Sequence, residues 1–159
     1  MNDFERPGVP RPSMVTTTKP SSARAWRSPR AAVKARLPQG ARRAVVGIDD
    51  AYCRAIAESL RDTKGADAVL RISARPGADC DVGVEATKVV LRVAGRTTEI
   101  ADIAGIGSLR GSHNAENVCA ASAALLSLPE PLAASDIARC LKTFPGLAHR
   151  MEELGRQGR

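Results

Sequence analysis

The sequence predicts an α/β fold, in which a partial mixed or parallel sheet with flanking helices follows a disordered basic N-terminus. Apolar runs at 44–48 and 68–72 enclose an amphipathic helical pattern, which is the order of a strand, a crossover helix and a parallel strand. Two further apolar runs, 89–93 and 97–100, flank a short glycine-containing turn and indicate a hairpin. The last third of the chain is helical in pattern, so the predicted sheet has helices to cover it.

The basic charge lies in the first 43 residues. They hold ten of the 24 Lys and Arg and two of the 17 Asp and Glu, so the other 116 residues hold 14 and 15. Residues 1–30 also contain five prolines and few apolar residues, which predicts disorder. Their Arg- and Ser-rich composition resembles that of an organelle transit peptide, but no apolar stretch of a secretory signal is present. Since the remainder is nearly neutral and only 3% of residues are aromatic, composition argues against nucleic-acid binding.

Composition also bears on membranes, metals and the compartment. The longest apolar runs are far shorter than the roughly 20 residues that span a bilayer, so no membrane segment is expected. The cysteines form no Cys-x-x-Cys pair and have no histidine at zinc-finger spacing. We expect them to be small buried side chains in a reducing cytosol, and hence a cytoplasmic protein. The four are Cys53, Cys80, Cys119 and Cys140.

The first half of the chain should open with a short helix over 31–37 that ends before Pro38. After the first strand, Asp49-Asp50 is placed to cap the next helix, and Gly65 is placed to end it. That helix carries apolar residues at i, i+3, i+4 and i+7, which predicts one buried face. The stripe consists of Cys53, Ile56, Ala57 and Leu60.

In the second half, a turn at 75–77 precedes the hairpin, which should lie at an edge of the sheet. Residues 115–128 are apolar on most faces and predict a buried helix. A second helix should begin at Ser135 as its N-cap and end at Pro145-Gly146. Its apolar stripe would be Ile137, Cys140, Leu141 and Phe144.

General catalytic signatures are missing from these 159 residues. There is no G-x-x-x-x-G-K-[ST] phosphate loop, and the glycines of 105–111 have the wrong spacing for a dinucleotide fingerprint. No G-x-S-x-G elbow occurs, and the chain contains only two histidines. A catalytic triad or a histidine-based metal site is therefore not expected.

Two segments nevertheless contain side chains suited to a nucleotide. In 111–117, Asn114 and Asn117 lie three residues apart at a helix start, and a carboxamide matches the amino group and ring nitrogen of adenine. The alternative is that Asn114 caps the helix. In 144–152, Arg150 follows a helix and could clamp a phosphate, or could be a solvated surface charge.

Together the two segments resemble the Mur ligase family. The matching residues are Gly111, His113, Asn114, Asn117, Ala120, Ala121 and the run Phe144–Glu152 with its Gly-Leu, His-Arg and Glu, and 46–53 is similar to a strand and helix start of the family's central domain. The similarity is strongest to members that add D-glutamate to UDP-N-acetylmuramoyl-L-alanine. It implies three parts: a disordered lead at 1–30, a partial central ATP-binding domain at 31–153, and a tail at 154–159.

The resemblance also implies roles for single residues. Asn114 and Asn117 would face adenine with His113 in the same site, and Arg150 would meet the phosphates of ATP. Lys34 is similar to a family lysine that is carbamylated and helps to hold Mg²⁺, since a carbamate supplies oxygen ligands to a hard cation. A lysine on an ordinary helix surface is the alternative for Lys34.

The family transfers the γ-phosphoryl group of ATP to a carboxylate, and an amino acid then attacks the acyl phosphate to give an amide. The implied partners are a nucleotide-sugar peptide precursor and D-glutamate, in peptidoglycan synthesis. Because the phosphate loop is missing and residues 1–30 match nothing in the family, we expect a truncated, inactive fragment whose first thirty codons are out of register. The alternatives are a non-catalytic nucleotide-binding or interaction remnant, and a basic-tailed nucleic-acid-binding protein.

Overall fold

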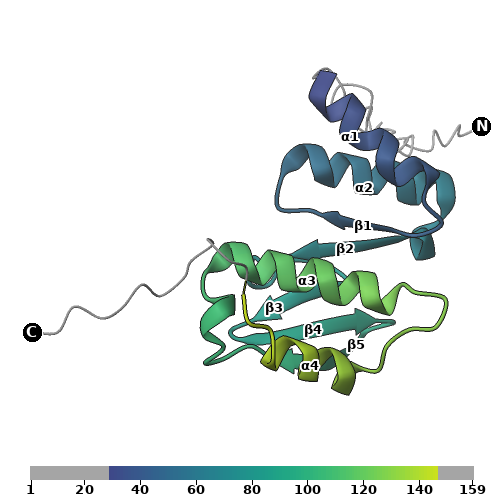
Figure 1. Ribbon diagram of the computed structural model, residues 1–159. Helices are drawn as coiled ribbons and strands as arrows, with labels where there is room; N and C mark the ends of the chain where they lie inside the picture. Colours follow the sequence, from purple (N-terminus) through teal and green to yellow (C-terminus); the bar gives the residue numbers. More distant parts are fainter. Residues whose placement is uncertain (1–28, 147–159) are drawn as a thin grey trace, which may run out of the picture.

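The computed structural model describes residues 29–146, which form a five-stranded sheet between two layers of helices (Figure 1). The strands lie in the order β1-β2-β3-β4-β5, with β1, β2 and β3 parallel and β3, β4 and β5 antiparallel. Their bounds are β1 Ala44–Gly47, β2 Val69–Ser73, β3 Val82–Glu85, β4 Lys88–Val93 and β5 Arg96–Asp102. The predicted α/β class and mixed sheet are confirmed.

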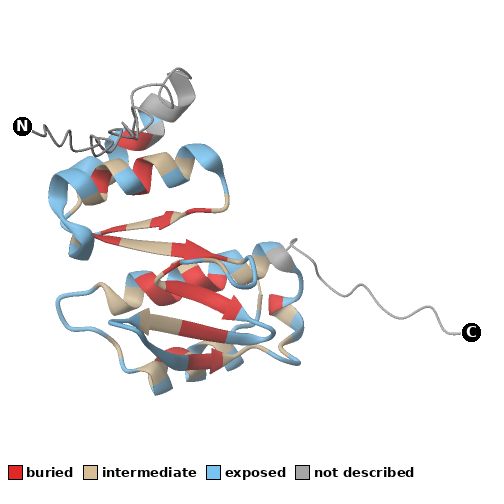
Figure 2. Ribbon diagram, turned by 180° about the vertical axis from the view of Figure 1, so that it is seen from behind, coloured by how far each residue is buried: buried red, intermediate tan, exposed pale blue. Residues whose placement is uncertain are grey.

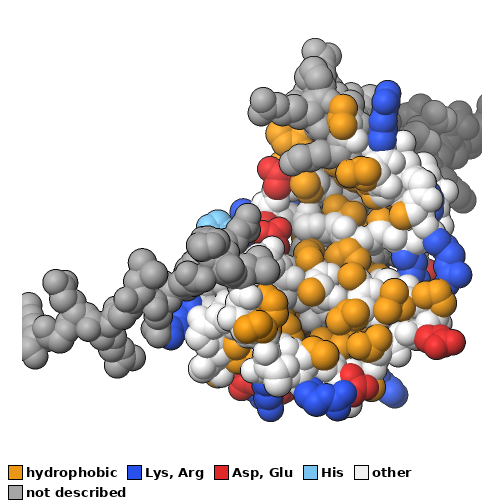
Figure 3. Space-filling view, viewed as in Figure 1, with side chains coloured by type: hydrophobic (Ala, Val, Ile, Leu, Met, Phe, Trp, Pro, Cys, Tyr) orange, Lys and Arg blue, Asp and Glu red, His pale blue; other side chains and the backbone are white. Residues whose placement is uncertain are grey.

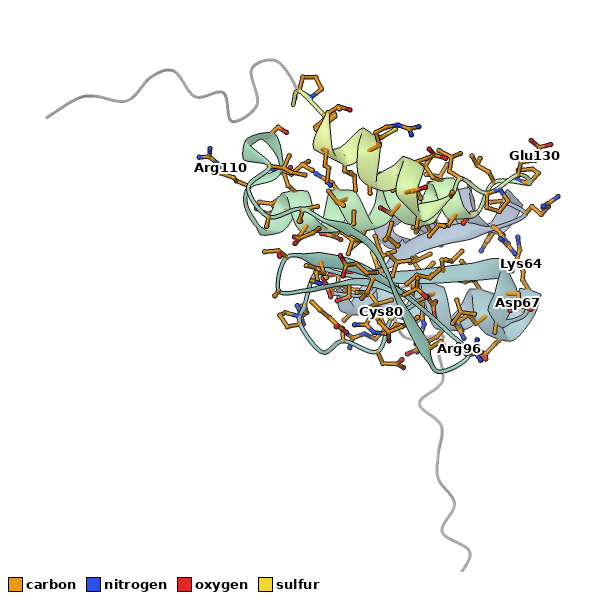
Figure 4. All side chains as sticks on the ribbon, turned by 90° about the horizontal axis from the view of Figure 1, so that it is seen from below. Lys64, Asp67, Cys80, Arg96, Arg110 and Glu130 are labelled. Atoms are coloured by element: carbon orange, nitrogen blue, oxygen red, sulfur yellow. The ribbon has the colours of Figure 1, made fainter. Side chains whose placement is uncertain are left out.

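Helices cover both faces of the sheet. One core cluster joins the first two helices to β1 and β2, and the other joins the last two helices to the opposite face. Viewed from below, the sheet lies between these layers (Figure 4). The helices are α1 Pro29–Gly40, α2 Ala51–Lys64, α3 Ser112–Leu126 and α4 Ala134–Lys142, with single 3-10 turns η2 Ala66–Ala68 and η3 Gly107–Leu109.

The predicted strand, helix and parallel strand are present as β1, α2 and β2. Asp50 Oδ1 accepts hydrogen bonds from the Tyr52 and Cys53 amides at 2.9 and 3.1 Å, so the aspartate caps α2 as expected. Ile56, Ala57 and Leu60 of its apolar stripe are buried, and Cys53 is half-buried. Gly65 follows the helix with a φ of +94°, a conformation that glycine adopts without strain.

The hairpin of β4 and β5 also agrees with the prediction. Its two-residue turn, Ala94-Gly95, has positive φ at both positions, which suits the twist of the flanking strands. β5 is an edge strand, as expected. Strand β3, in contrast, was not predicted, although it occupies the centre of the sheet and its Val82 and Val84 are buried (Figure 2).

The prediction that the first helix ends before Pro38 is wrong. α1 begins at Pro29 and runs through Pro38 to Gly40. In the last turn a proline removes only one helical hydrogen bond, the one to the carbonyl four residues earlier, so the helix tolerates it there. A side chain of α2 satisfies other carbonyls, those at the end of the helix. The Lys64 ammonium group donates to the carbonyl oxygens of Gln39 and Ala41, at 2.8 Å for the latter. The cation therefore satisfies carbonyls at the helix end.

Three other details differ from the sequence prediction. α3 spans Ser112–Leu126, and only one of its sides is buried, since Ala121 and Ala124 are exposed to solvent. α4 begins at Ala134 with Ala133 as N-cap, so Ser135 lies inside its first turn. Of the cysteines, Cys80 and Cys119 are buried, Cys53 is half-buried and Cys140 is exposed.

Residues 1–28 and 147–159 lie outside the described region, and with them nearly all of the predicted lead and the whole tail. Within the described residues, no helix has both the length and the apolar character that a bilayer crossing requires. The same part of the chain contains no group of three or more His, Cys, Asp or Glu side chains arranged to hold a metal ion.

Candidate nucleotide site at the start of helix α3

The first turns of α3 lie over the carboxyl ends of two parallel strands. The Cys119 thiol contacts the carbonyl oxygen of Ser73, the last residue of β2, at 3.8 Å. On β1, a Cβ added to Gly47 would lie 2.9 Å from Oε1 of Glu116, so the absence of a side chain there lets α3 approach. Ligands of open α/β sheets bind outside the carboxyl ends of the strands, which makes this edge the candidate site.

Asn114 and Asn117 both lie in the first two turns of α3. Asn114 is half-buried, and its Nδ2 donates to the Arg110 carbonyl at 2.7 Å, whereas Asn117 is exposed. The N-cap position is held by Gly111, with φ of +92° and no side-chain acceptor, so Asn114 is not the N-cap residue. The helix start thus presents an asparagine pair directly after a glycine N-cap.

The other predicted site residues are placed only in part. His113 is exposed in the first turn of α3, next to Asn114. The backbone of Lys34 lies in α1, on the opposite side of the sheet from α3, and the structure does not describe its side chain. Arg150 lies outside the described residues. The structure therefore brings His113, Asn114 and Asn117 together and leaves Lys34 and Arg150 as predictions.

A hydrogen-bonded group at the same edge was not predicted as part of the site. Asp49, just after β1, accepts from the Ser73 hydroxyl and from the Ala74 amide at 3.0 Å. The Ser73 oxygen in turn accepts from the Arg75 amide at 3.0 Å. Only the position of Asp49 after a strand hinted at this group, because Ser73 is 24 residues away in sequence.

A cavity of about 510 Å³ adjoins the start of α3, between the loop before this helix and the turn that joins β3 to β4. Its lining includes Ala115 but neither asparagine, so it is distinct from the face that Asn117 presents. Arg110 lies at its rim and projects from the loop before α3 (Figure 4). The lining residues are Ala74, Pro76, Val84, Ala86, Thr87, Ile103, Ala104, Gly105, Ile106, Leu109, Arg110, Gly111 and Ala115.

The thiol under α3 is unsuited to chemistry. Burial raises the pKa of Cys119 from 9.0 to about 12, so the side chain is a neutral thiol at physiological pH. Burial likewise raises the pKa of Cys80, on the opposite face of the sheet. Both residues pack the core and offer no reactive thiolate to the site.

Several curated proteins that are similar to this chain carry the same name. The chain is 47% identical over 130 residues to a UDP-N-acetylmuramoylalanine–D-glutamate ligase of Brucella abortus (strain 2308), a match that covers 81% of this chain and 27% of that protein. Ligases of the same name from Nitrobacter winogradskyi and Mesorhizobium japonicum are 46% and 43% identical, over 80% of this chain and 27% and 26% of their own lengths. The resemblance to the Mur ligases is confirmed.

The chain spans about a quarter of the length of these Mur ligases. The match therefore concerns one part of each relative. No family model matches the chain. No solved structure matches it either.

Proposed function

We propose that this chain forms the adenine-binding part of a UDP-N-acetylmuramoylalanine–D-glutamate ligase. The observation that carries the proposal is the position of Asn114 and Asn117, which follow one another by a turn on α3 at the carboxyl ends of β1 and β2. Identity of 41–47% to ligases of this name over about 80% of the chain supports the choice of family.

The chemistry of the site is that of purine recognition. Asn117 is exposed, so both its amide donor and its carbonyl acceptor can meet the edge of an adenine ring. Asn114 donates to the Arg110 carbonyl, which orients its carboxamide at the helix start, and Oδ1 is the atom that would accept from the ring's amino group. His113 would flank the base from the same turn, and Arg150 would clamp the phosphates of ATP.

A metal role is proposed for one residue. As a carbamate, Lys34 would supply oxygen ligands to Mg²⁺, which neutralises phosphate charge during phosphoryl transfer. The complete reaction would join D-glutamate to UDP-N-acetylmuramoyl-L-alanine through an acyl phosphate. These 159 residues contain no G-x-x-x-x-G-K-[ST] loop, so we propose that they bind the base without turning over on their own.

Calorimetric titration with ATP and with ITP tests base recognition. ITP carries an oxo group in place of the adenine amino group, which reverses the donor and acceptor pattern of the base edge. The carboxamide of Asn114 cannot turn to match the reversed pattern, because its Nδ2 is held by the Arg110 carbonyl. We expect ATP to bind and ITP to bind at least about tenfold more weakly, which corresponds to about 1.4 kcal/mol. Equal affinity for the two nucleotides would refute adenine recognition.

Substitutions assign the binding to the asparagines. Asn117→Ala should weaken ATP binding by about tenfold or more, since the donor and acceptor pair that it would offer the base is lost. Ala121→Asn, one turn further along the exposed side of α3, is the matched control and should leave the affinity unchanged. An unchanged affinity in Asn117→Ala would contradict the proposed site.

Turnover is tested with UDP-N-acetylmuramoyl-L-alanine, D-glutamate, ATP and Mg²⁺. No dipeptide product is expected from the 159-residue chain alone. Formation of product would show that these residues suffice for catalysis, which contradicts the proposed inactivity and leaves the proposed base recognition standing.

A further inference from the structure

The carboxylate of Glu116 lies at the carboxyl end of β1. A Cβ placed on Gly47, the last residue of that strand, would be 2.9 Å from Oε1 of Glu116, so the carboxylate lies close to the glycine backbone. Glu116 belongs to the first two turns of α3 and is exposed. Figure 3 shows acidic side chains next to the pale-blue histidine on this part of the surface. A carboxylate therefore stands at the strand edge where the nucleotide is proposed to bind.

A second carboxylate at this edge is already engaged. Asp49 accepts from the Ser73 hydroxyl and from the Ala74 amide, and its side chain is only 21% exposed. Within residues 29–146, the Glu116 carboxylate has neither a hydrogen bond nor an ion pair. Of these two carboxylates, Glu116 can accept hydrogen bonds from a ligand without giving up a contact of the fold.

Helix geometry places Glu116 on a different side of α3 from the asparagines. A helix turns by about 100° per residue, so Asn114 and Glu116, two residues apart, point to nearly opposite flanks. Asn117 lies between these flanks on the solvent side, since the next two residues, Val118 and Cys119, are buried. The order across the exposed surface of α3 is therefore Asn114, Asn117 and Glu116.

This order fits a nucleoside that lies across the helix. A helix with its side chains is roughly 10–12 Å wide, which is about the length of a base and its sugar together. With the base at the asparagines, the sugar would be next to Glu116. A carboxylate repels phosphate oxygens, but its two oxygens can accept from the two adjacent hydroxyl groups of a ribose. In dinucleotide-binding sheets an acidic side chain accepts from a ribose hydroxyl in the same way.

We propose that Glu116 selects ribonucleotides, because its carboxylate accepts hydrogen bonds from the ribose hydroxyls while Asn114 and Asn117 read the base. The inference rests on the proposed adenine site and adds a specificity-determining residue to it. Gly47 has a part in this selection, since the absence of a side chain there leaves room for the carboxylate at the strand end.

Calorimetric titration of the 159-residue chain with ATP and with 2′-deoxy-ATP tests the selection. The deoxynucleotide lacks one of the two hydroxyl donors, and a hydrogen bond to a charged acceptor is a strong one. We expect 2′-deoxy-ATP to bind about tenfold more weakly than ATP. The same comparison with 3′-deoxy-ATP removes the other donor and should also weaken binding.

Glu116→Ala assigns the selection to the carboxylate. This variant should bind ATP as weakly as the unmodified chain binds 2′-deoxy-ATP, or more weakly, and should no longer distinguish the two nucleotides. Its preference for ATP over ITP should persist, because the asparagines are unchanged. Glu130→Ala removes an exposed glutamate beyond the other end of α3 and is the matched control (Figure 4). This control should discriminate like the unmodified chain.

Gly47→Ala moves the carboxylate without removing it. The added Cβ would lie 2.9 Å from Oε1, and the end of a flexible glutamate side chain can shift away, so the fold should be preserved. We expect the affinity ratio of ATP to 2′-deoxy-ATP to fall toward one. Gly40→Ala is the control, because nothing lies within 4 Å of a Cβ there.

The possible failures are distinguishable. A chain that prefers ATP to ITP but binds 2′-deoxy-ATP as tightly as ATP would overturn this inference and leave adenine recognition standing. A chain that binds no ATP would overturn both. Selection that survives Glu116→Ala would also refute the role of Glu116. Tighter ATP binding in that variant would place the carboxylate beside the phosphates, and an effect that disappears without Mg²⁺ would make it a metal ligand, so either result would overturn the ribose contact.

Discussion

The hydroxyl of Ser73, at the end of β2, donates a hydrogen bond to Oδ1 of Asp49, which follows β1. Ser73 is fully buried and the Asp49 side chain is only 21% exposed, so the carboxylate must find its partners within the protein. The Ala74 amide supplies a second donor at 3.0 Å. This pair holds the ends of two parallel strands together directly beside the start of α3.

Removal of the Asp49 carboxylate should destabilise the fold. Asp49→Ala leaves the buried Ser73 hydroxyl and the Ala74 amide without their acceptor, and we expect a loss of about 1–3 kcal/mol in the free energy of unfolding. Urea denaturation followed by circular dichroism measures it. Asp67→Ala, an exposed aspartate of η2, is the control and should change stability little. Equal midpoints for the two variants would contradict the structural role of Asp49.

Lys64 should hold α1 to the rest of the molecule. Its ammonium group donates to the carbonyls of Gln39 and Ala41, and it is exposed, so the expected change in global stability of Lys64→Met is below about 1 kcal/mol. The local effect should be larger, with faster amide hydrogen exchange in residues 35–41. Lys142→Met at the end of α4 is the control. Unaltered exchange in α1 would show that the lysine does not support this helix end.

The β1, α2 and β2 unit was predictable because its signals are local. An aspartate before the helix, a glycine after it and an apolar stripe between them each act within a few residues, and Asp50, Gly65 and Ile56 all have the expected roles. The start of α3 could be recognised from the sequence for the same reason, since Asn114 and Asn117 lie only three residues apart.

The features that sequence reasoning missed depend on distant contacts. β3 is only four residues long and contains Gly83. A glycine in so short a segment is a local signal for a turn, so the strand was not predicted. The Asp49 and Ser73 pair joins residues that are 24 positions apart in sequence, and the end of α1 is contacted by Lys64 of another helix.

Gly83 should resist substitution because β3 is packed closely on one face. A Cβ at this position would lie 2.8 Å from Sγ of Cys80, closer than packed atoms allow, and 3.0 Å from Nη1 of Arg92, which is a tight contact. We expect Gly83→Ala to reduce the free energy of unfolding by about 1–3 kcal/mol, as overpacked cores do. Gly40→Ala is the control, because nothing lies within 4 Å of a Cβ there. Thermal unfolding of both variants is the measurement. If both had the melting temperature of the unmodified chain, the packing argument would be contradicted.

Cys119 should make stability depend on alkaline pH. Burial raises the pKa of its thiol from 9.0 to about 12, so the folded state keeps the proton over a range in which the unfolded chain releases it. The contribution of the neutral thiol is fully present below pH 9 and is lost as the pH rises toward 12. The stability advantage of the unmodified chain over Cys119→Ala, measured by urea denaturation, should therefore be constant up to about pH 9 and shrink above it. Cys140→Ala, which removes an exposed thiol, should show no such change. A difference between the unmodified chain and Cys119→Ala that stays constant into the alkaline range would mean that the buried thiol ionises as freely when folded as when unfolded.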